Sequence, residues 1–414
     1  MFLKIDQEVI REIFYFSLAG LFICFGFNFG AYFFLYSSCI LGAGLIIHDC
    51  LRNELVISKY FWFPVLFILY VSITPGEPFK DLRIGGMMAA AFVAGVAAYT
   101  FFKDKFSTLS FFLPMALAAY FLAHTVWSVT FDQSFFPVEK YAGRLTLSFS
   151  HPNVLGEMAS LGILLLLSFP SEQKNVRKVG YALIAILGVM IVLTAGRSTY
   201  LGIITALFLY AIIKHGKKSI AAFLMFLFLA AGSLPFLPKT EQQRLVSTLQ
   251  DPLNDPNFKN RLPMWLAAID GFKESPFIGN SMRGFKEFHT EYIAKNSEKL
   301  ENKLGYETEK KAYSHPHNAY LAVLHGWGLI GCSLILTVFV HATCISLKRK
   351  EYLAIYAIVF MLAYGVFDVR FQSKTGDLFL FFPLGTAYAS LLACRNVSVR
   401  HCTPPISKEK MQNN

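Results

Sequence analysis

Three motifs bearing arginine or histidine stand where a helix is expected to begin, and such positions suit anion binding and proton transfer. The first runs from Thr194 to Gly202 and contains Arg197. A helix that begins here, capped by Ser198 or Thr199, would direct its free backbone N–H groups toward the same place as the arginine fork. The motif therefore predicts a site for a phosphate-like anion. The alternative from spacing alone is an interfacial arginine that contacts lipid phosphate.

The second motif contains Arg261 within a polar stretch. Asn260 predicts a helix cap and Pro263 predicts the first turn, so Arg261 would lie beside a helix N-terminus. Apolar residues then recur at helical spacing until Ser275 and Pro276 end the pattern. The same anion-binding logic applies here. The alternative is a solvated loop arginine.

The third motif runs from Ser314 to Leu321, where the polar stretch returns to an apolar run. His315 and His317 lie at this junction, and Asn318 predicts a cap for the following helix. Imidazole can accept a proton near neutral pH, so His317 is a candidate general base. The alternative is an interfacial histidine bonded to backbone.

A fourth motif, from Arg144 to Glu157, places a carboxylate inside an apolar run. A charge at membrane depth is costly, so such a residue is expected to serve a function. Glu157 is expected to pair with a basic residue near the outer face. The alternative is a purely structural ion pair.

Several catalytic signatures are absent from the sequence. No DxD or carboxylate pair occurs in an outer loop, and there is no P-loop, GxSxG or HExxH motif. The seven cysteines show no CxxC or metal-type spacing. We therefore expect no metal and no nucleotide cofactor, which disfavours an ATPase, a serine hydrolase and a metal-dependent transferase.

The elements that must position these motifs are membrane helices. Of the 414 residues, 55% are apolar and 16% are charged, so the chain is expected to be an all-α polytopic membrane protein with about twelve spans. Glycines after the third motif favour close helix packing there. The expected spans are 12–28, 31–47, 58–74, 84–102, 108–130, 146–169, 179–195, 198–213, 219–236, 317–346, 352–368 and 377–394.

The net charge of +11 reflects basic residues in the breaks between apolar runs, so it indicates topology rather than nucleic-acid binding. Lys and Arg concentrate in alternate short loops. The positive-inside rule then places both termini in the cytoplasm. The expected organisation is a bundle over 1–236, a helical periplasmic loop over 237–315, three more spans over 316–394 and a cytoplasmic tail over 395–414. A second amphipathic helix is expected in the loop, from about Phe285 to Leu300.

The order and spacing of the motifs TAGRSTYLG, NRLPMWLAAIDGFKESPFIGN and SHPHNAYLAVLHGWGLIG resemble the O-antigen ligase and polymerase superfamily, and SHPNVLGEMASLGILLL upstream fits it as well. Within that superfamily, the chain is most similar to the lipopolysaccharide O-antigen ligases. The likeness spans roughly residues 144–331. Its motifs are weak singly and more specific as an ordered set.

The resemblance implies a multi-pass bacterial inner-membrane enzyme with its active site facing the periplasm. It implies transfer of O-antigen from undecaprenyl pyrophosphate to lipid A-core, with inversion at the anomeric carbon and no metal. The family's two essential arginines map to Arg197 and Arg261, and its essential histidine maps to His317. Expected partners are the lipid-linked O-antigen, the lipid A-core acceptor and membrane lipids, and no nucleic acid. Residues expected to help bind pyrophosphate or acceptor are Arg144, Glu157, Ser198, His315 and Asn318.

Two other functions remain open at this stage. Polymerases of the superfamily carry an arginine-to-glycine motif with ten intervening residues, whereas Arg144 and Gly156 are separated by eleven, which mildly favours a ligase. A flippase or other transporter would also have about twelve spans. Transporters usually carry charges at mid-membrane. Here Glu157 is expected to be the main charge within the spans.

Overall fold

The computed structural model describes residues 7–27, 30–52, 55–73, 78–131, 144–221, 223–224, 256–304, 313–369 and 373–394. Most of the expected span 219–236, the first part of the expected loop and the tail 395–414 lie outside these residues. The described part is almost entirely helical, in agreement with the predicted all-α class. One small addition is a pair of three-residue strands, β1 (Leu55–Ile57) and β2 (Leu392–Cys394), which run antiparallel.

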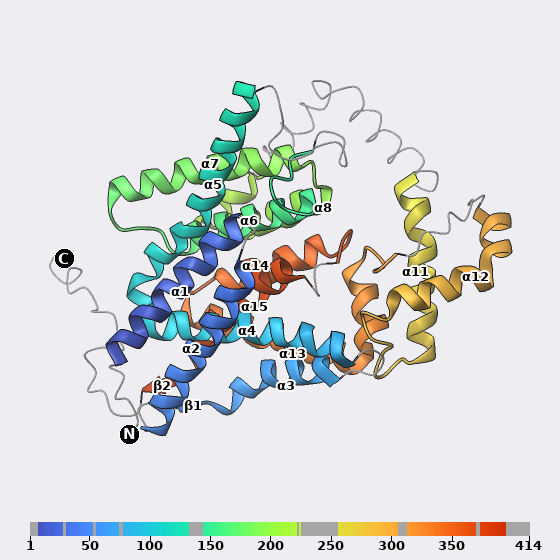
Figure 1. Ribbon diagram of the computed structural model, residues 1–414, viewed down its shortest axis with the longest axis horizontal. Helices are drawn as coiled ribbons and strands as arrows, with labels where there is room; N and C mark the ends of the chain where they lie inside the picture. The colour runs from blue at the N-terminus through green and yellow to red at the C-terminus, as the bar shows by residue number, and fades with distance from the viewer. Residues whose placement is uncertain are drawn as a thin grey trace.

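Thirteen α-helices make up most of the described residues (Figure 1). Their bounds are α1 (Gln7–Phe27), α2 (Ala31–Leu51), α3 (Trp62–Ile73), α4 (Pro78–Phe102), α5 (Phe106–Phe131), α6 (Pro152–Ser168), α7 (Lys174–Thr194), α8 (Arg197–His215), α11 (Pro256–Glu274), α12 (Phe285–Leu304), α13 (Ala319–Arg349), α14 (Leu353–Tyr364) and α15 (Lys374–Ala389). Gly30, at φ 65°, makes the left-handed turn that separates α1 from α2.

Six stretches of the described chain are long and apolar enough to cross a membrane. They are α1, α2, the continuous stretch 81–131 through α4 and α5, α7, α8 and α13. Shorter apolar helices occupy 59–73, α6 and α14. The chain is therefore a multi-pass membrane protein by length and composition, and the count of twelve spans remains an expectation.

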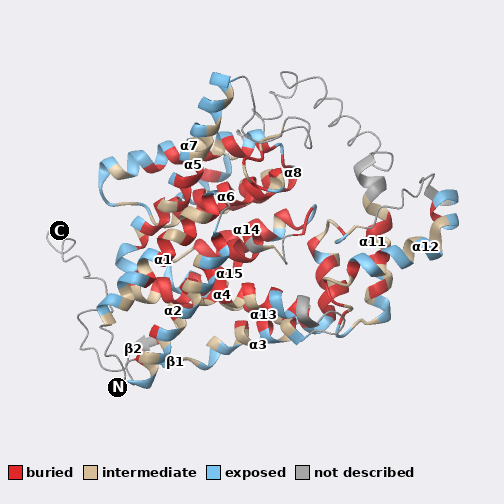
Figure 2. Cartoon of the chain, viewed as in Figure 1, coloured by how far each residue is buried: buried red, intermediate tan, exposed pale blue. Residues whose placement is uncertain are grey.

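One apolar core joins the spanning helices, as the buried residues in Figure 2 show. At its centre α4 and α15 approach so closely that a Cβ on Gly95 or on Gly385 would overlap the backbone of the other helix. Close approach at glycine compensates for the missing hydrophobic drive between helices in lipid. The expectation that Glu157 is the main charge in the spans is wrong. Asp368 and Asp377 also lie in expected spans, and both are almost fully buried.

Helices α11 and α12 form a second, smaller core on α13, which joins Met264, Ala268 and Phe285. The predicted amphipathic helix from Phe285 is thus confirmed, and it extends to Leu304. His289 on α12 is 2% exposed, and this burial lowers its pKa to about 4. The α11–α12 pair therefore depends on a neutral histidine.

Helix α13 is broken at Gly328, where φ is 58° and ψ is −164°. The segment after α11 fills the break. Leu329 N–H donates to Pro276 O over 2.8 Å, and Ile330 N–H donates to Phe277 O over 3.1 Å. A Cβ at Gly328 would meet Phe277 O at 2.5 Å. The glycines of this motif thus allow close approach, as predicted, and they also let α11 dock by backbone bonds.

Several contacts join segments for which the sequence predicts the same side of the membrane. Strand β1 follows α2, and its partner β2 follows α15. Lys103 forms an ion pair with Glu351 at 2.9 Å. All these segments were assigned to the cytoplasmic side, so the fold is compatible with the predicted alternation of loops.

Candidate functional site

The turn before α13 holds His317 in a strained conformation. Its φ is 50°, which is uncommon for a residue with a Cβ. Neighbouring elements fix the turn. Trp265 Nε1 of α11 donates to Pro316 O at 2.9 Å, and Ala319 N–H donates to Gly365 O at 2.7 Å. Asn318 caps α13 as predicted, accepting from Leu321 N–H at 3.0 Å. Such strain costs on the order of 1–3 kcal/mol and persists only where surrounding contacts impose it.

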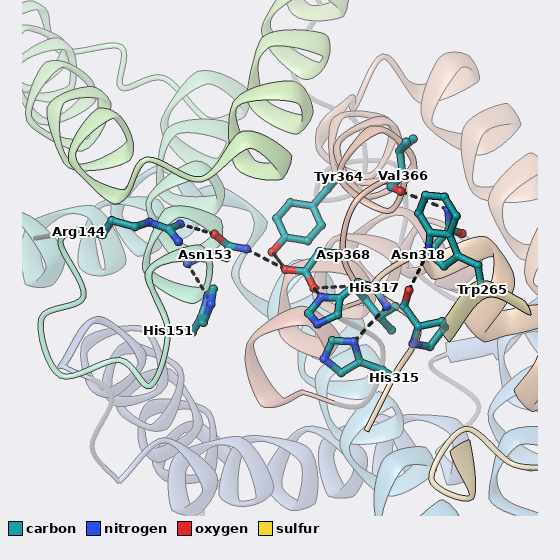
Figure 3. A network of polar contacts seen from close by, with 12 residues as sticks. Arg144, His151, Asn153, Trp265, His315, His317, Asn318, Tyr364, Val366 and Asp368 are labelled. Carbon is teal, nitrogen blue, oxygen red and sulfur yellow. Dashed lines mark hydrogen bonds and ion pairs between the residues drawn. The ribbon is translucent and has the colours of Figure 1, made fainter. Parts of the chain in front are cut away.

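Asp368, just after α14, faces the His317 ring. Its Oδ1 lies 3.4 Å from His317 Nδ1 and accepts from Val369 N–H at 2.9 Å. Its Oδ2 accepts from Tyr364 Oη at 2.9 Å and from Asn153 Nδ2 at 2.9 Å. This carboxylate is therefore held from both sides and directed at the histidine (Figure 3).

Asn153 links this pair to Arg144. Arg144 Nη2 donates to Asn153 Oδ1 at 3.0 Å, and Arg144 Nε donates to Thr194 O at the end of α7 at 2.7 Å. Figure 3 shows the resulting row of side chains from Arg144 through Asn153 and Asp368 to His317. His151 is the N-cap of α6, and its Nδ1 accepts from Asn153 N–H at 3.1 Å. Asn153 of the fourth sequence motif is thus connected to His317 of the third motif through Asp368.

Arg197 is the first residue of α8 and is exposed. The helix cap is Gly196, with no side-chain bond, so the prediction that Ser198 or Thr199 caps this helix is wrong. Both hydroxyl residues lie inside the first turn and are buried. A Cβ on Gly196 would lie 2.9 Å from Asn153 Oδ1, so the α8 N-terminus directly adjoins the network.

Arg261 lies in the second turn of α11. The helix begins at Pro256, so the predicted start with Asn260 as cap is wrong, and Pro263 lies inside the helix. Proline is favoured at the first helical position, and in α11 that position is occupied by Pro256 rather than by Pro263. The Arg261 guanidinium carbon lies 6.0 Å from the centre of the Phe367 ring, beside Asp368. The structure therefore brings Arg261 to the same corner as the His317–Asp368 pair.

The remaining predicted residues take different places. Glu157 is fully buried in α6, one turn after Asn153. His315 is half-buried, and its Nδ1 accepts from His317 N–H at 3.4 Å. The two imidazole rings lie 4.2 Å apart.

Backbone strain gathers around this network. Five non-glycine residues of the described chain have positive φ, and three of them border the network. Leu147, at 49°, follows Arg144 by three residues, and Ala195, at 46°, lies between Thr194 and Gly196. His317 is the third. Strained positions cluster at functional sites, because surrounding contacts must impose them.

Ligand atoms of His315, His317 and Asp368 lie within 4.8 Å of one another, close enough to hold a metal ion. Two histidines and a carboxylate are donors that Zn²⁺ accepts. However, the Asp368 oxygens already have four polar neighbours, which is about the capacity of a carboxylate. A metal here would have to displace some of these contacts.

Sequence reasoning missed Asp368 and assigned Asn153 no role. The rule that flagged Glu157 applies equally to Asp368, a carboxylate at the end of an apolar run. Asn153 lies inside the fourth motif, but it is uncharged, so the rule about charges in apolar runs did not single it out. Its bonds depend on tertiary contacts that spacing does not reveal.

Comparison with known proteins shows similarity to one protein family. A family model described as O-Antigen ligase matches residues 182–336. The match includes Arg197, Arg261 and His317, and it confirms the resemblance to the O-antigen ligase and polymerase superfamily. Arg144, Asn153 and Asp368 lie outside the matched range. No curated protein matches the chain.

Proposed function

We propose that this protein is an O-antigen ligase that transfers a saccharide from undecaprenyl pyrophosphate to a sugar hydroxyl of lipid A-core. The single observation that carries the proposal is the His317–Asp368 pair at 3.4 Å, adjoining the motifs that bear Arg197 and Arg261. A proton acceptor beside anion-binding groups suits a hydroxyl nucleophile and a pyrophosphate leaving group.

The reaction follows from the chemistry of these groups. Asp368 accepts the Nδ1–H of His317, which leaves the lone pair of Nε2 available. The acceptor hydroxyl transfers its proton to Nε2 as its oxygen bonds to the anomeric carbon. The bond from that carbon to the pyrophosphate oxygen breaks at the same time, with inversion. Arg197 and Arg261 stabilise the negative charge that the pyrophosphate gains.

The proposed reaction needs neither metal nor nucleotide. The activated lipid donor supplies the bond energy, and the arginines take the place of a metal at the leaving group. The four polar neighbours of Asp368 favour its use in orienting His317 over metal binding. Arg144 and Asn153 hold this carboxylate in place, so they act as positioning residues.

The proposed location is the bacterial inner membrane, with the site facing the periplasm and both termini in the cytoplasm. The positive-inside pattern supports this orientation. The contacts of β1 with β2 and of Lys103 with Glu351 support the alternation of the loops, because each contact joins segments expected on the same side.

A polymerase is the second candidate, because Arg144 belongs to the network. An arginine at this place is the feature that the polymerase subgroup shares. Both enzymes would use the same lipid-linked donor and differ in the acceptor. Supplying purified lipid A-core or a second lipid-linked chain therefore separates the two functions.

Substitution of the two arginines tests the proposed grip on pyrophosphate. Arg197→Ala and Arg261→Ala should each lower transfer about a hundredfold, because each removes a donor from the developing charge. Transfer is measured with purified protein, lipid-linked donor and lipid A-core. Lys273→Ala is the control, since Lys273 is an exposed cation on the same helix as Arg261. Normal transfer by both arginine variants would overturn this assignment.

A further inference from the structure

A hollow lies among α5, α6, α7 and α8, at the ends of α7 and α8 that are remote from the candidate site. It is a shallow hollow with a cavity volume of about 30 Å³, and it is partly open to its surroundings. Helix α7 has 21 residues, so its two ends are about 30 Å apart, which matches the hydrocarbon thickness of a bilayer. Since Thr194 and Arg197 are at the site end, the hollow lies at the opposite membrane face.

Two cations line this hollow, Arg177 from the first turn of α7 and Lys214 from the last turn of α8. No acidic residue of the described chain lines it. Lys214 Nζ donates to Tyr210 Oη at 2.7 Å and lies 5.2 Å from the centre of that ring, so the ammonium is held at the mouth. Among the described residues, the Arg177 guanidinium has no hydrogen bond or ion pair.

The rest of the lining is apolar. Phe111, Leu166 and Ile184 form walls that belong to a small buried cluster between α5, α6 and α7. Gly180 keeps the space open, because a Cβ there would already contact the Phe111 ring at 3.4 Å. The hollow thus has cationic and apolar linings side by side. This combination matches an anionic lipid, in which a phosphate adjoins acyl chains.

We propose that this hollow binds the phosphate headgroup of an anionic phospholipid in the leaflet opposite the candidate site. Arg177 and Lys214 contact the phosphate, and the first methylenes of an acyl chain lie against Phe111 and Ile184. The bound lipid ties α7 to α8 at their remote ends. This site is independent of saccharide transfer, so its test needs no substrate.

Binding to phosphatidylglycerol is measured on the purified full-length protein in nanodiscs of phosphatidylcholine, by native mass spectrometry after titration. The double variant R177Q/K214Q should bind about thirtyfold more weakly than the wild type, since each basic residue near a membrane surface contributes about a factor of five. The matched control is K178Q/K218Q, which removes two cations predicted to lie on the same side and outside the hollow. The control should retain most of the affinity.

A second variant, Gly180→Leu, keeps both cations and fills the space. This variant should also weaken binding of phosphatidylglycerol. It provides the test if the double variant fails to fold. Equal losses in R177Q/K214Q and in the control would overturn the proposal, because the attraction would then be diffuse. Undiminished binding by folded Gly180→Leu would also overturn it. Displacement of the lipid by millimolar inorganic phosphate would show a free-phosphate site and contradict the lipid assignment.

Discussion

At the residue scale, the site depends on one histidine whose environment the sequence only half reveals. The motif SHPHN identified His317, and the likeness to a family chose it over His315. His315 and His317 are both half-buried, so exposure does not separate them. What distinguishes His317 is Asp368, which lies just after α14, 51 positions later along the chain. No local spacing rule could have paired them.

The first prediction separates the two histidines. His317→Ala should lower transfer about 10²–10⁴-fold, the usual value of general base help, while binding of the lipid donor persists. His315→Ala should keep most activity, because the bond that His315 Nδ1 accepts from the His317 backbone N–H is long, at 3.4 Å. Steady-state transfer and a separate donor-binding assay measure the two effects. An essential His315 beside a dispensable His317 would mean that the proton acceptor has been misassigned.

At the element scale, helix contacts set the position of every residue in the network. The amphipathic patterns correctly predicted the helices α11 and α12. The predicted start of α11 and the predicted cap of α8 were wrong. Asn260 and Ser198 satisfied local capping rules, but tertiary packing overrode these rules. The break at Gly328 could not be predicted from the sequence either, because it depends on backbone hydrogen bonds from the segment after α11.

Gly156 tests the close contact of α6 with α8. A Cβ there would meet Thr199 Cγ2 at 2.8 Å and Thr199 Oγ1 at 2.9 Å, and both atoms belong to a stiff β-branched side chain. Gly156→Ala should destabilise the protein by about 1–3 kcal/mol and reduce transfer by displacing Asn153. Thermal unfolding and transfer are measured together.

Two further variants make that test specific. Gly188→Ala on α7 is the control, because its Cβ would meet nothing within 4 Å, and it should match the wild type. G156A/T199A should recover much of the lost stability, since it removes both clashing atoms. A Gly156→Ala protein as stable and active as the wild type would refute tight α6–α8 packing.

The α11–α12 pair should respond to acid. The pKa of His289 is about 4 in the folded protein and about 6.5 in an unfolded chain, so the unfolded chain binds more protons between these values. Stability present at neutral pH should therefore fall as the pH falls from about 6.5 to about 4, and then level off. The neighbouring groups are Phe285 and Tyr313, with His325 on α13 beyond Phe285.

Thermal unfolding as a function of pH measures this effect. His289→Leu should reduce the slope of the curve across that window, because leucine has no proton to gain. A variant curve with the same slope as the wild type would assign the acid sensitivity to other groups.

At the scale of the whole molecule, composition alone predicted a multi-pass helical protein, and the structure agrees. The count of spans could not be settled in the same way, because α6, α14 and α15 are shorter than an ordinary span. The polar network is at the ends of α6, α7, α8, α11, α13 and α14, elements spread over most of the chain. Its assembly therefore requires the complete bundle. For this reason the sequence motifs could identify several residues of the network but not the hydrogen bonds between them.

The most direct test of the central claim is reconstituted transfer from lipid-linked donor to lipid A-core, with excess EDTA, by the wild type and by Asp368→Asn. The account predicts that the chelator leaves wild-type transfer unchanged. It also predicts that Asp368→Asn loses roughly one to four orders of magnitude, because the amide cannot orient and charge-balance His317. Transfer abolished by EDTA and restored by Zn²⁺ would contradict the account, since His315, His317 and Asp368 would then be metal ligands.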